Sequence, residues 1–114
     1  MLIKQKIEIL DSTLREGEQT PGVSFTVDQK IRMAKQLDAF GVDFIELGHP
    51  AVSPDVYEAV DALNDLNLNA KKMAHGRALI SDIDDALNIG VDWMGIFFGT
   101  SDLSLKYKFN VTKL

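Results

Sequence analysis

Cysteine is absent from the 114-residue chain, and so are any clustered excess of basic residues and any long apolar run. Without cysteine, disulfide frameworks and thiolate metal sites are both excluded. The net charge is −5 and the densest basic stretch is only Lys106-Tyr107-Lys108. This balance argues against a general nucleic-acid binder, because neutralising phosphates requires clustered lysine and arginine. No apolar run approaches the roughly 20 residues needed to cross a bilayer.

The N-terminal residues 1–6 lack the apolar region of a secretory signal, because charge resumes almost at once. We therefore expect no nucleic-acid and no membrane partner, and the absence of cysteine favours a reducing, cytoplasmic location. The composition that remains is globular, with 46% hydrophobic residues. That content is enough for one modest domain with a core, which we expect to span residues 1–114.

Four short apolar runs alternate with segments of helical pattern. The strand candidates lie near residues 7–10, 44–47, 71–74 and 93–98. These runs are too short for helices and mostly do not alternate strictly, which is typical of buried parallel strands. The helix-start signals are Thr26 with Gln29, Ser53 with Pro54, and Ser81, and the stop signals are Gly41 and Gly90. The order β-α-β-α-β-α-β predicts a parallel sheet joined by right-handed crossovers.

Two architectures share this alternation, the doubly wound sheet and the TIM barrel. The glycine fingerprint of a dinucleotide site does not follow the first strand. Instead, polar side chains gather at the carboxyl ends of the expected strands: Arg15 and Glu16, Glu46, His75, and the hydroxyls of Thr100 and Ser101. A barrel builds its active site from such side chains, but a whole barrel needs roughly 200 residues or more. We therefore predict an α/β fold that is a partial TIM barrel, namely a half barrel of four parallel strands alternating with helices.

The most informative segment is the loop of residues 11–19, Asp-Ser-Thr-Leu-Arg-Glu-Gly-Glu-Gln. It places three carboxylates, one guanidinium and one amide directly after a buried strand. A purely structural ion-pair network is the alternative interpretation, because Arg15 would neutralise Asp11 or Glu16 in that case too.

Together with Thr20, Pro21 and Gly22, this loop resembles the signature of a superfamily of metal-dependent barrels. Homocitrate, isopropylmalate and citramalate synthases belong to it, as do hydroxymethylglutaryl-CoA lyases and biotin-dependent carboxyltransferases. Phe98-Gly99-Thr100-Ser101 and Lys106-Tyr107-Lys108 resemble the homocitrate synthase branch, and the resemblance runs from Ile9 to Thr112. It implies an acyltransferase that condenses acetyl-CoA with a 2-oxo acid and then hydrolyses the thioester, in amino-acid biosynthesis or a related pathway.

The resemblance also implies roles for single residues. Glu16 occupies the position of an acidic ligand to a divalent metal of the Zn, Mg, Mn or Co class, and Arg15 that of the cation that steadies the ketone oxygen as charge builds. Gln19 is expected to orient the acyl group of acetyl-CoA, His75 to contact substrate, and Asp11 to hold the loop.

Several of these positions have a structural alternative. Glu46 is either a scaffold ion pair, with Arg15 as its partner, or a substrate contact. Thr100 and Ser101 either bind a substrate carboxylate or cap the next helix, and His75 either contacts substrate or bonds a neighbouring loop. His49, which precedes a proline, is interpreted as a turn residue, and the pair of phenylalanines at 97 and 98 as packing.

The chain departs from the family pattern in two ways. The family completes its metal site with a His-x-His pair, which this sequence lacks because its two histidines lie far apart. Glu16 alone cannot hold a catalytic metal, which takes about three protein ligands, so we predict that the 114-residue chain alone is inactive. Gly95 stands where some homocitrate synthases carry an acid, which leaves 2-oxoglutarate, pyruvate and 2-oxoisovalerate open as acceptors.

Two other functions remain open from the sequence. One is a lyase or carboxyltransferase that uses the same loop. The other is a non-catalytic half barrel that self-assembles, because an open four-stranded sheet leaves exposed edges. We accordingly expect a homo-oligomer, or completion of the ring by a missing half barrel.

Overall fold

The computed structural model describes residues 5–111, in which four parallel strands form one sheet in the order β1-β2-β3-β4. The strands are β1 (Leu10–Asp11), β2 (Phe44–Gly48), β3 (Lys71–Arg77) and β4 (Trp93–Phe97). The helices are α1 (Val27–Phe40), α2 (Pro54–Asn64) and α3 (Ile80–Ile89). Short helical turns complete the described chain: η1 (Gly17–Gln19), η2 (Pro50–Val52) and the π-helical η3 (Ser104–Lys108).

Each strand pairs with the strand that follows it in the sequence. Leu10 pairs with Phe44, Phe44 with Lys71, and Met73 with Trp93, all in parallel. A doubly wound sheet would reverse its strand order at a switch point, whereas consecutive order in one direction is the arrangement of a barrel wall. The fold is therefore the predicted partial TIM barrel, four parallel strands alternating with helices.

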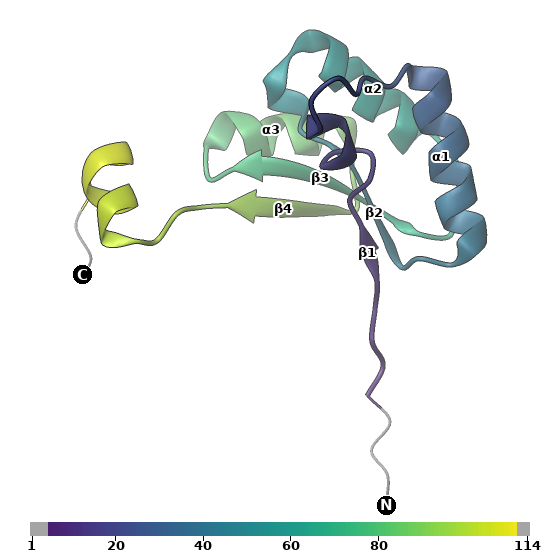
Figure 1. Cartoon of the computed structure of the whole chain (residues 1–114), viewed down its shortest axis with the longest axis horizontal. Helices are drawn as coiled ribbons and strands as arrows, with labels where there is room; N and C mark the ends of the chain where they lie inside the picture. The colour runs from purple at the N-terminus through teal and green to yellow at the C-terminus, as the bar shows by residue number, and fades with distance from the viewer. Residues whose placement is uncertain (1–4, 112–114) are drawn as a thin grey trace, which may run out of the picture.

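The three α-helices lie on the same side of the sheet (Figure 1). Between them and the sheet is an apolar core, whose largest fully buried side chains are Leu14, Ile45, Leu47, Val60 and Leu63. On the other side of the sheet the described residues place no helix (Figure 1). No helix in this part of the chain has the length and apolar character needed to span a membrane.

Local signals set the ends of the first two helices as predicted. Thr26 and Gln29 form both hydrogen bonds of a capping box, and Gly41 ends α1 with φ of 99°. Ser53 Oγ accepts a hydrogen bond from the backbone N–H of Val56 at the start of α2. Each of these contacts joins residues within four positions of each other, so the local sequence is enough to predict it.

Other predicted boundaries were wrong. Ser81 does not cap α3, which begins at Ile80 with Leu79 as its N-cap and no side-chain cap bond. The first strand is shorter than the predicted residues 7–10. The partner strand β2 begins at Phe44, which pairs with Leu10, so the parallel pairing starts only at Leu10. Conversely β3 continues through His75 to Arg77, because β4 pairs with it along its whole carboxyl end.

The phenylalanines at 97 and 98, which the sequence indicated as packing residues, lie outside the apolar core. Their side chains are 56% and 43% exposed. Phe97 ends the outermost strand, and Phe98 stacks on Phe109 with ring centroids 4.4 Å apart. Within the described chain β4 is an edge strand whose main neighbour is β3, which explains why these aromatic side chains stay exposed.

Candidate functional site

The loop that follows β1 folds into a tight turn at the carboxyl end of the sheet. Asp11 Oδ1 accepts a hydrogen bond from the backbone N–H of Thr13 at 2.9 Å, and the N–H of Glu16 donates to the carbonyl of Ser12 at 2.7 Å. Leu14 is 1% exposed and anchors this turn in the core. The neighbouring Arg15 therefore lies within reach of Glu46 on β2.

Arg15 lies between two carboxylates. Its Nε donates a hydrogen bond to Glu46 Oε1, and its Nη1 donates to Glu16 Oε2 at 2.8 Å. The side chain of Glu46 is 5% exposed, whereas that of Glu16 is 62% exposed. A buried carboxylate needs a counter-charge, and Arg15 provides it as expected. The guanidinium is thus held in one orientation by a buried anion and a solvent-facing one.

His75 lies beside this cation, and its ring meets the ring of His49 edge to face with centroids 5.4 Å apart. Burial lowers the pKa of His75 below its ordinary value, and the nearby positive charge of Arg15 lowers the pKa further, against an opposing effect of Glu16. His75 is therefore neutral at pH 7. Arg15, Glu16 and His75 share the carboxyl end of the sheet, the arrangement on which the enzyme interpretation depends.

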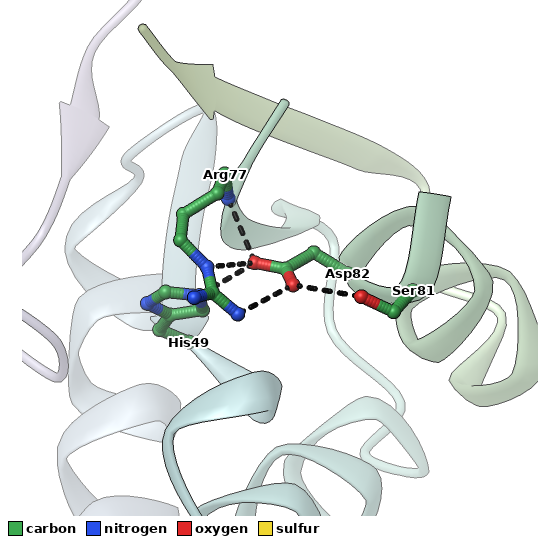
Figure 2. A network of polar contacts seen from close by, with 4 residues as sticks. All are labelled: His49, Arg77, Ser81 and Asp82. Atoms are coloured by element: carbon green, nitrogen blue, oxygen red, sulfur yellow. Dashed lines mark hydrogen bonds and ion pairs between the residues drawn. The ribbon is translucent and has the colours of Figure 1, made fainter. Parts of the chain in front are cut away.

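A buried acid on α3, Asp82, also lies at this end of the sheet. It was not among the site residues predicted from the sequence. Asp82 accepts hydrogen bonds from His49 Nε2 at 3.1 Å and from the backbone N–H and Nε of Arg77 at 2.9 and 3.0 Å (Figure 2). The hydrogen bond to Arg77 is the main reason why the pKa of Asp82 is far below its ordinary value. Its position offered a signal, because Asp82 has the helical spacing of the buried Ala86 and Ile89.

His49 is more than the turn residue that the sequence indicated. It occupies the position directly after β2 and contacts both Asp82 and His75. The preceding Gly48 has φ of 156°, and a side-chain carbon there would lie 2.9 Å from Val60. Only glycine therefore allows β2 to pack on α2 at this point and deliver His49 to the carboxyl end.

A cavity of about 240 Å³ opens between the β1 loop and the end of β2. It is lined by Leu14, Arg15, Glu18, Gln19, Lys30, Gly48, His49, Val52 and Val56. Lys30 is buried and forms an ion pair with Glu18 at 2.6 Å, which fixes one wall. Polar groups on a partly apolar wall suit a small ligand with a charged end.

Thr100 and Ser101 lie beyond β4 and do not line this cavity. Ser101 Oγ accepts a hydrogen bond from the backbone N–H of Ser104 at 3.1 Å, which is the capping geometry that was one of its two interpretations. Thr100 is exposed to solvent. The structure groups Arg15 with Glu46, Glu16 and His75. Gln19 lies on the cavity wall beside Arg15, whereas Thr100 and Ser101 follow β4 and are not among the residues that line that cavity.

The described residues do not fit a complete metal centre. Within residues 5–111 no three or more His, Cys, Asp or Glu side chains are grouped to hold an ion. Glu16 is the exposed carboxylate at this end and is engaged by Arg15. A catalytic divalent metal, which takes about three protein ligands, would need ligands in addition to those described.

Comparisons with known proteins identify the family of the chain. The HMGL-like family model matches residues 6–114. The homocitrate synthase of Pyrococcus abyssi is 55% identical over 104 residues, which cover 91% of this chain and 29% of that protein. The homocitrate synthase of Saccharolobus solfataricus is 50% identical over 112 residues, or 95% of this chain and 24% of that protein. The chain thus spans less than a third of the length of these curated relatives.

A solved structure supports the fold. The crystal structure of the Bacillus subtilis HMG-CoA lyase superposes with a TM-score of 0.71 at 23% identity. The match covers 94% of this chain and 38% of the lyase chain. Because the family model matches nearly the whole sequence, the chain belongs to the HMGL-like family.

Proposed function

We propose that this chain supplies the first four strands of an acyltransferase active site that condenses acetyl-CoA with a 2-oxo acid. The identity of 50–55% to proteins named homocitrate synthase supports this reaction over the lyase alternative. The similarity to the lyase structure, at 23% identity, supports the fold alone. The whole reaction belongs to a protein longer than the part described.

The proposal rests on one observation: the guanidinium of Arg15 is held between the carboxylates of Glu46 and Glu16. Arginine has five N–H donors, so it can hold Glu46 and Glu16 and still donate to a substrate oxygen. Attack of an enolate on a ketone turns the ketone oxygen into an alkoxide. A cation already fixed in place stabilises that charge without reorganising during the reaction.

His75 complements this cation as a neutral group. Because its pKa is lowered, the ring at pH 7 offers one N–H donor and one acceptor and adds no second positive charge. A neutral donor beside Arg15 suits a carboxylate oxygen of a 2-oxo acid. Gln19, on the cavity wall, is proposed to orient the acyl group of acetyl-CoA.

Glu16 is the residue that this chain is proposed to contribute to a divalent-metal site of the Zn, Mg, Mn or Co class. Its exposed position at the carboxyl end of the sheet is compatible with sharing an ion with ligands outside residues 5–111. The 114-residue chain alone is accordingly expected to release no CoA from acetyl-CoA with any 2-oxo acid.

A chimera tests the proposal directly. Residues of this chain would replace the matching segment of the Pyrococcus abyssi homocitrate synthase, and release of the CoA thiol would be followed with 2-oxoglutarate, pyruvate and 2-oxoisovalerate. We expect turnover with one of these acceptors. Because the remaining barrel comes from the relative, the chimera asks whether the side chains of this chain can perform their proposed roles.

The decisive variant is Arg15→Lys in this chimera. Lysine keeps the charge but loses the fork that spans two carboxylates, so kcat should fall by about 10²-fold. Arg32→Lys, on the exposed face of α1, is the matched control and should leave kcat unchanged. A folded chimera without turnover, or equal activity in the two lysine variants, would contradict the proposal.

A further inference from the structure

The buried carboxylate of Asp82 holds one of the two histidines through a contact to which the proposed reaction assigns no role. The side chain of Asp82 is 1% exposed, and Oδ2 lies 3.1 Å from His49 Nε2. Both carboxylate oxygens also accept hydrogen bonds from Arg77. Figure 2 shows the three side chains converging from α3, from the end of β3 and from the residue after β2.

The contact determines which nitrogen of His49 carries hydrogen. An ionised carboxylate only accepts hydrogen bonds, and the low pKa of Asp82 keeps it ionised at neutral pH. Nε2 of His49 must therefore carry the hydrogen that it donates to Asp82. In a neutral ring this leaves Nδ1 as an acceptor, and Figure 2 shows that nitrogen directed away from Asp82.

The fixed orientation of the His49 ring in turn limits the position of the His75 ring. Its ring meets that of His75 at 85° with centroids 5.4 Å apart, a packed edge-to-face contact. His49 also lines the cavity that Arg15 and Gln19 line. A ring fixed at Nε2 therefore forms both a wall of the cavity and a support for His75.

We propose that Asp82 is a positioning residue that fixes the tautomer and ring orientation of His49, and that His49 in turn orients His75 beside Arg15. The inference rests on the proposed function in one respect, because the orientation of His75 matters for catalysis only if His75 contacts substrate. Asp82 itself is buried and does not line the cavity beside Arg15. The competing role is purely structural, with Asp82 tying α3 to Arg77 and His49 merely adjacent.

Nuclear magnetic resonance of the imidazole nitrogens separates the two roles in the 114-residue protein. His49 and His75 are the only histidines of the sequence, so single substitutions assign their signals. At a pH where both rings are neutral, we expect His49 to show the Nε2–H tautomer alone. In Asp82→Asn the amide has one acceptor oxygen where the carboxylate has two, so His49 should lose its single tautomer and the His75 signals should shift.

The matched control is Asp84→Asn, an exposed acid two residues along the same helix, which should change neither ring. A mixture of tautomers at His49 in the unsubstituted protein would overturn the inference. So would a His49 spectrum that is the same in Asp82→Asn.

A second pair of variants covers the case in which Asp82→Asn does not fold. His49→Ala and His49→Phe both leave the contacts between Asp82 and Arg77 in place. We expect the alanine variant to shift the His75 ring signals and the phenylalanine variant to restore them, because its ring edge packs in the same place. Unchanged His75 signals in His49→Ala would overturn the positioning role.

These measurements use no substrate. A chimera that fails to condense acetyl-CoA with a 2-oxo acid would overturn the proposed function alone. A single tautomer of His49 that depends on Asp82 would still support the positioning role of Asp82.

Discussion

At the scale of single residues, the carboxyl end of the sheet is an arrangement of charges whose burial differs. Glu46 is nearly inaccessible, Arg15 is partly covered and Glu16 faces solvent. Arg15 is therefore both the counter-charge that Glu46 needs and the side chain that we propose to face a ligand. Structure and proposed function therefore depend on one guanidinium.

Removing Arg15 should destabilise the fold. Arg15→Leu leaves the carboxylate of Glu46 buried without its partner, which we expect to lower the free energy of unfolding by about 3 kcal/mol. Urea denaturation measures this loss. Adding Glu46→Gln should recover part of it, whereas Arg32→Leu on the exposed face of α1 should cost far less. Equal losses for the two leucine variants would contradict a buried pair.

The lowered pKa of His75 predicts a pH dependence of stability. The folded protein holds the proton of His75 less tightly than the unfolded chain, mainly because of burial and then because of Arg15. Below the unfolded pKa of about 6.5 the unfolded state therefore binds more protons, and the free energy of unfolding falls as the pH falls through this region. Thermal unfolding between pH 8 and 5 measures the effect, and His75→Gln should flatten it. A rise in stability on acidification would contradict the sign.

At the scale of elements, the end of β2 decides where the site forms. The strand places Glu46 beside Arg15. The chain then turns into η2 at Pro50, two residues after Gly48. Close packing of this backbone on α2 places His49 within reach of Asp82 on α3. A change in that packing would move the whole histidine pair.

Gly48→Ala should therefore cost more than a glycine substitution elsewhere. The new methyl group would lie 2.9 Å from Val60 Cγ2 on a backbone with φ of 156°, and we expect a loss of about 3 kcal/mol from strain and overpacking together. Gly22→Ala is the control, because its φ is 79° but no atom lies within 4 Å of the added carbon. It should cost about 1 kcal/mol. Denaturation of both variants tests the difference, and equal losses would count against the close approach.

At the scale of the whole molecule, the sheet formed by residues 5–111 has two open edges, along β1 and β4. Large apolar side chains on the outer strands remain about half exposed: Leu10 at 47%, Trp93 at 53%, Ile96 at 54% and Phe97 at 56%. Edges with unpaired backbone groups and apolar side chains favour pairing with other chains. The predicted oligomer or completed ring would cover these positions.

We expect the purified 114-residue chain to associate in a concentration-dependent manner. Sedimentation velocity measures this association, and Ile96→Glu on the outermost strand should weaken it by placing a charge at the edge. Leu87→Glu, on the exposed face of α3, carries the same change in charge away from the edges and should have little effect. A monomer at high concentration would contradict the prediction.

Much of the fold follows from signals that lie close together in the sequence. The alternation of apolar runs and helix caps predicted the parallel half barrel, and the loop of residues 11–19 predicted the family. The capping box at Thr26 is a local contact that needs no tertiary structure. Arg15 and Glu16 are adjacent, so their shared position was also accessible from the sequence alone.

Tertiary structure alone decided the rest. Asp82 and His49 are 33 residues apart, and their contact depends on strand register and on how closely β2 packs on α2. The sequence pattern likewise could not show that Phe97 and Phe98 stay exposed, because their burial depends on which faces other elements cover. Local signals set element type because they act within a few residues, whereas partners across the sheet are chosen by packing of the whole chain.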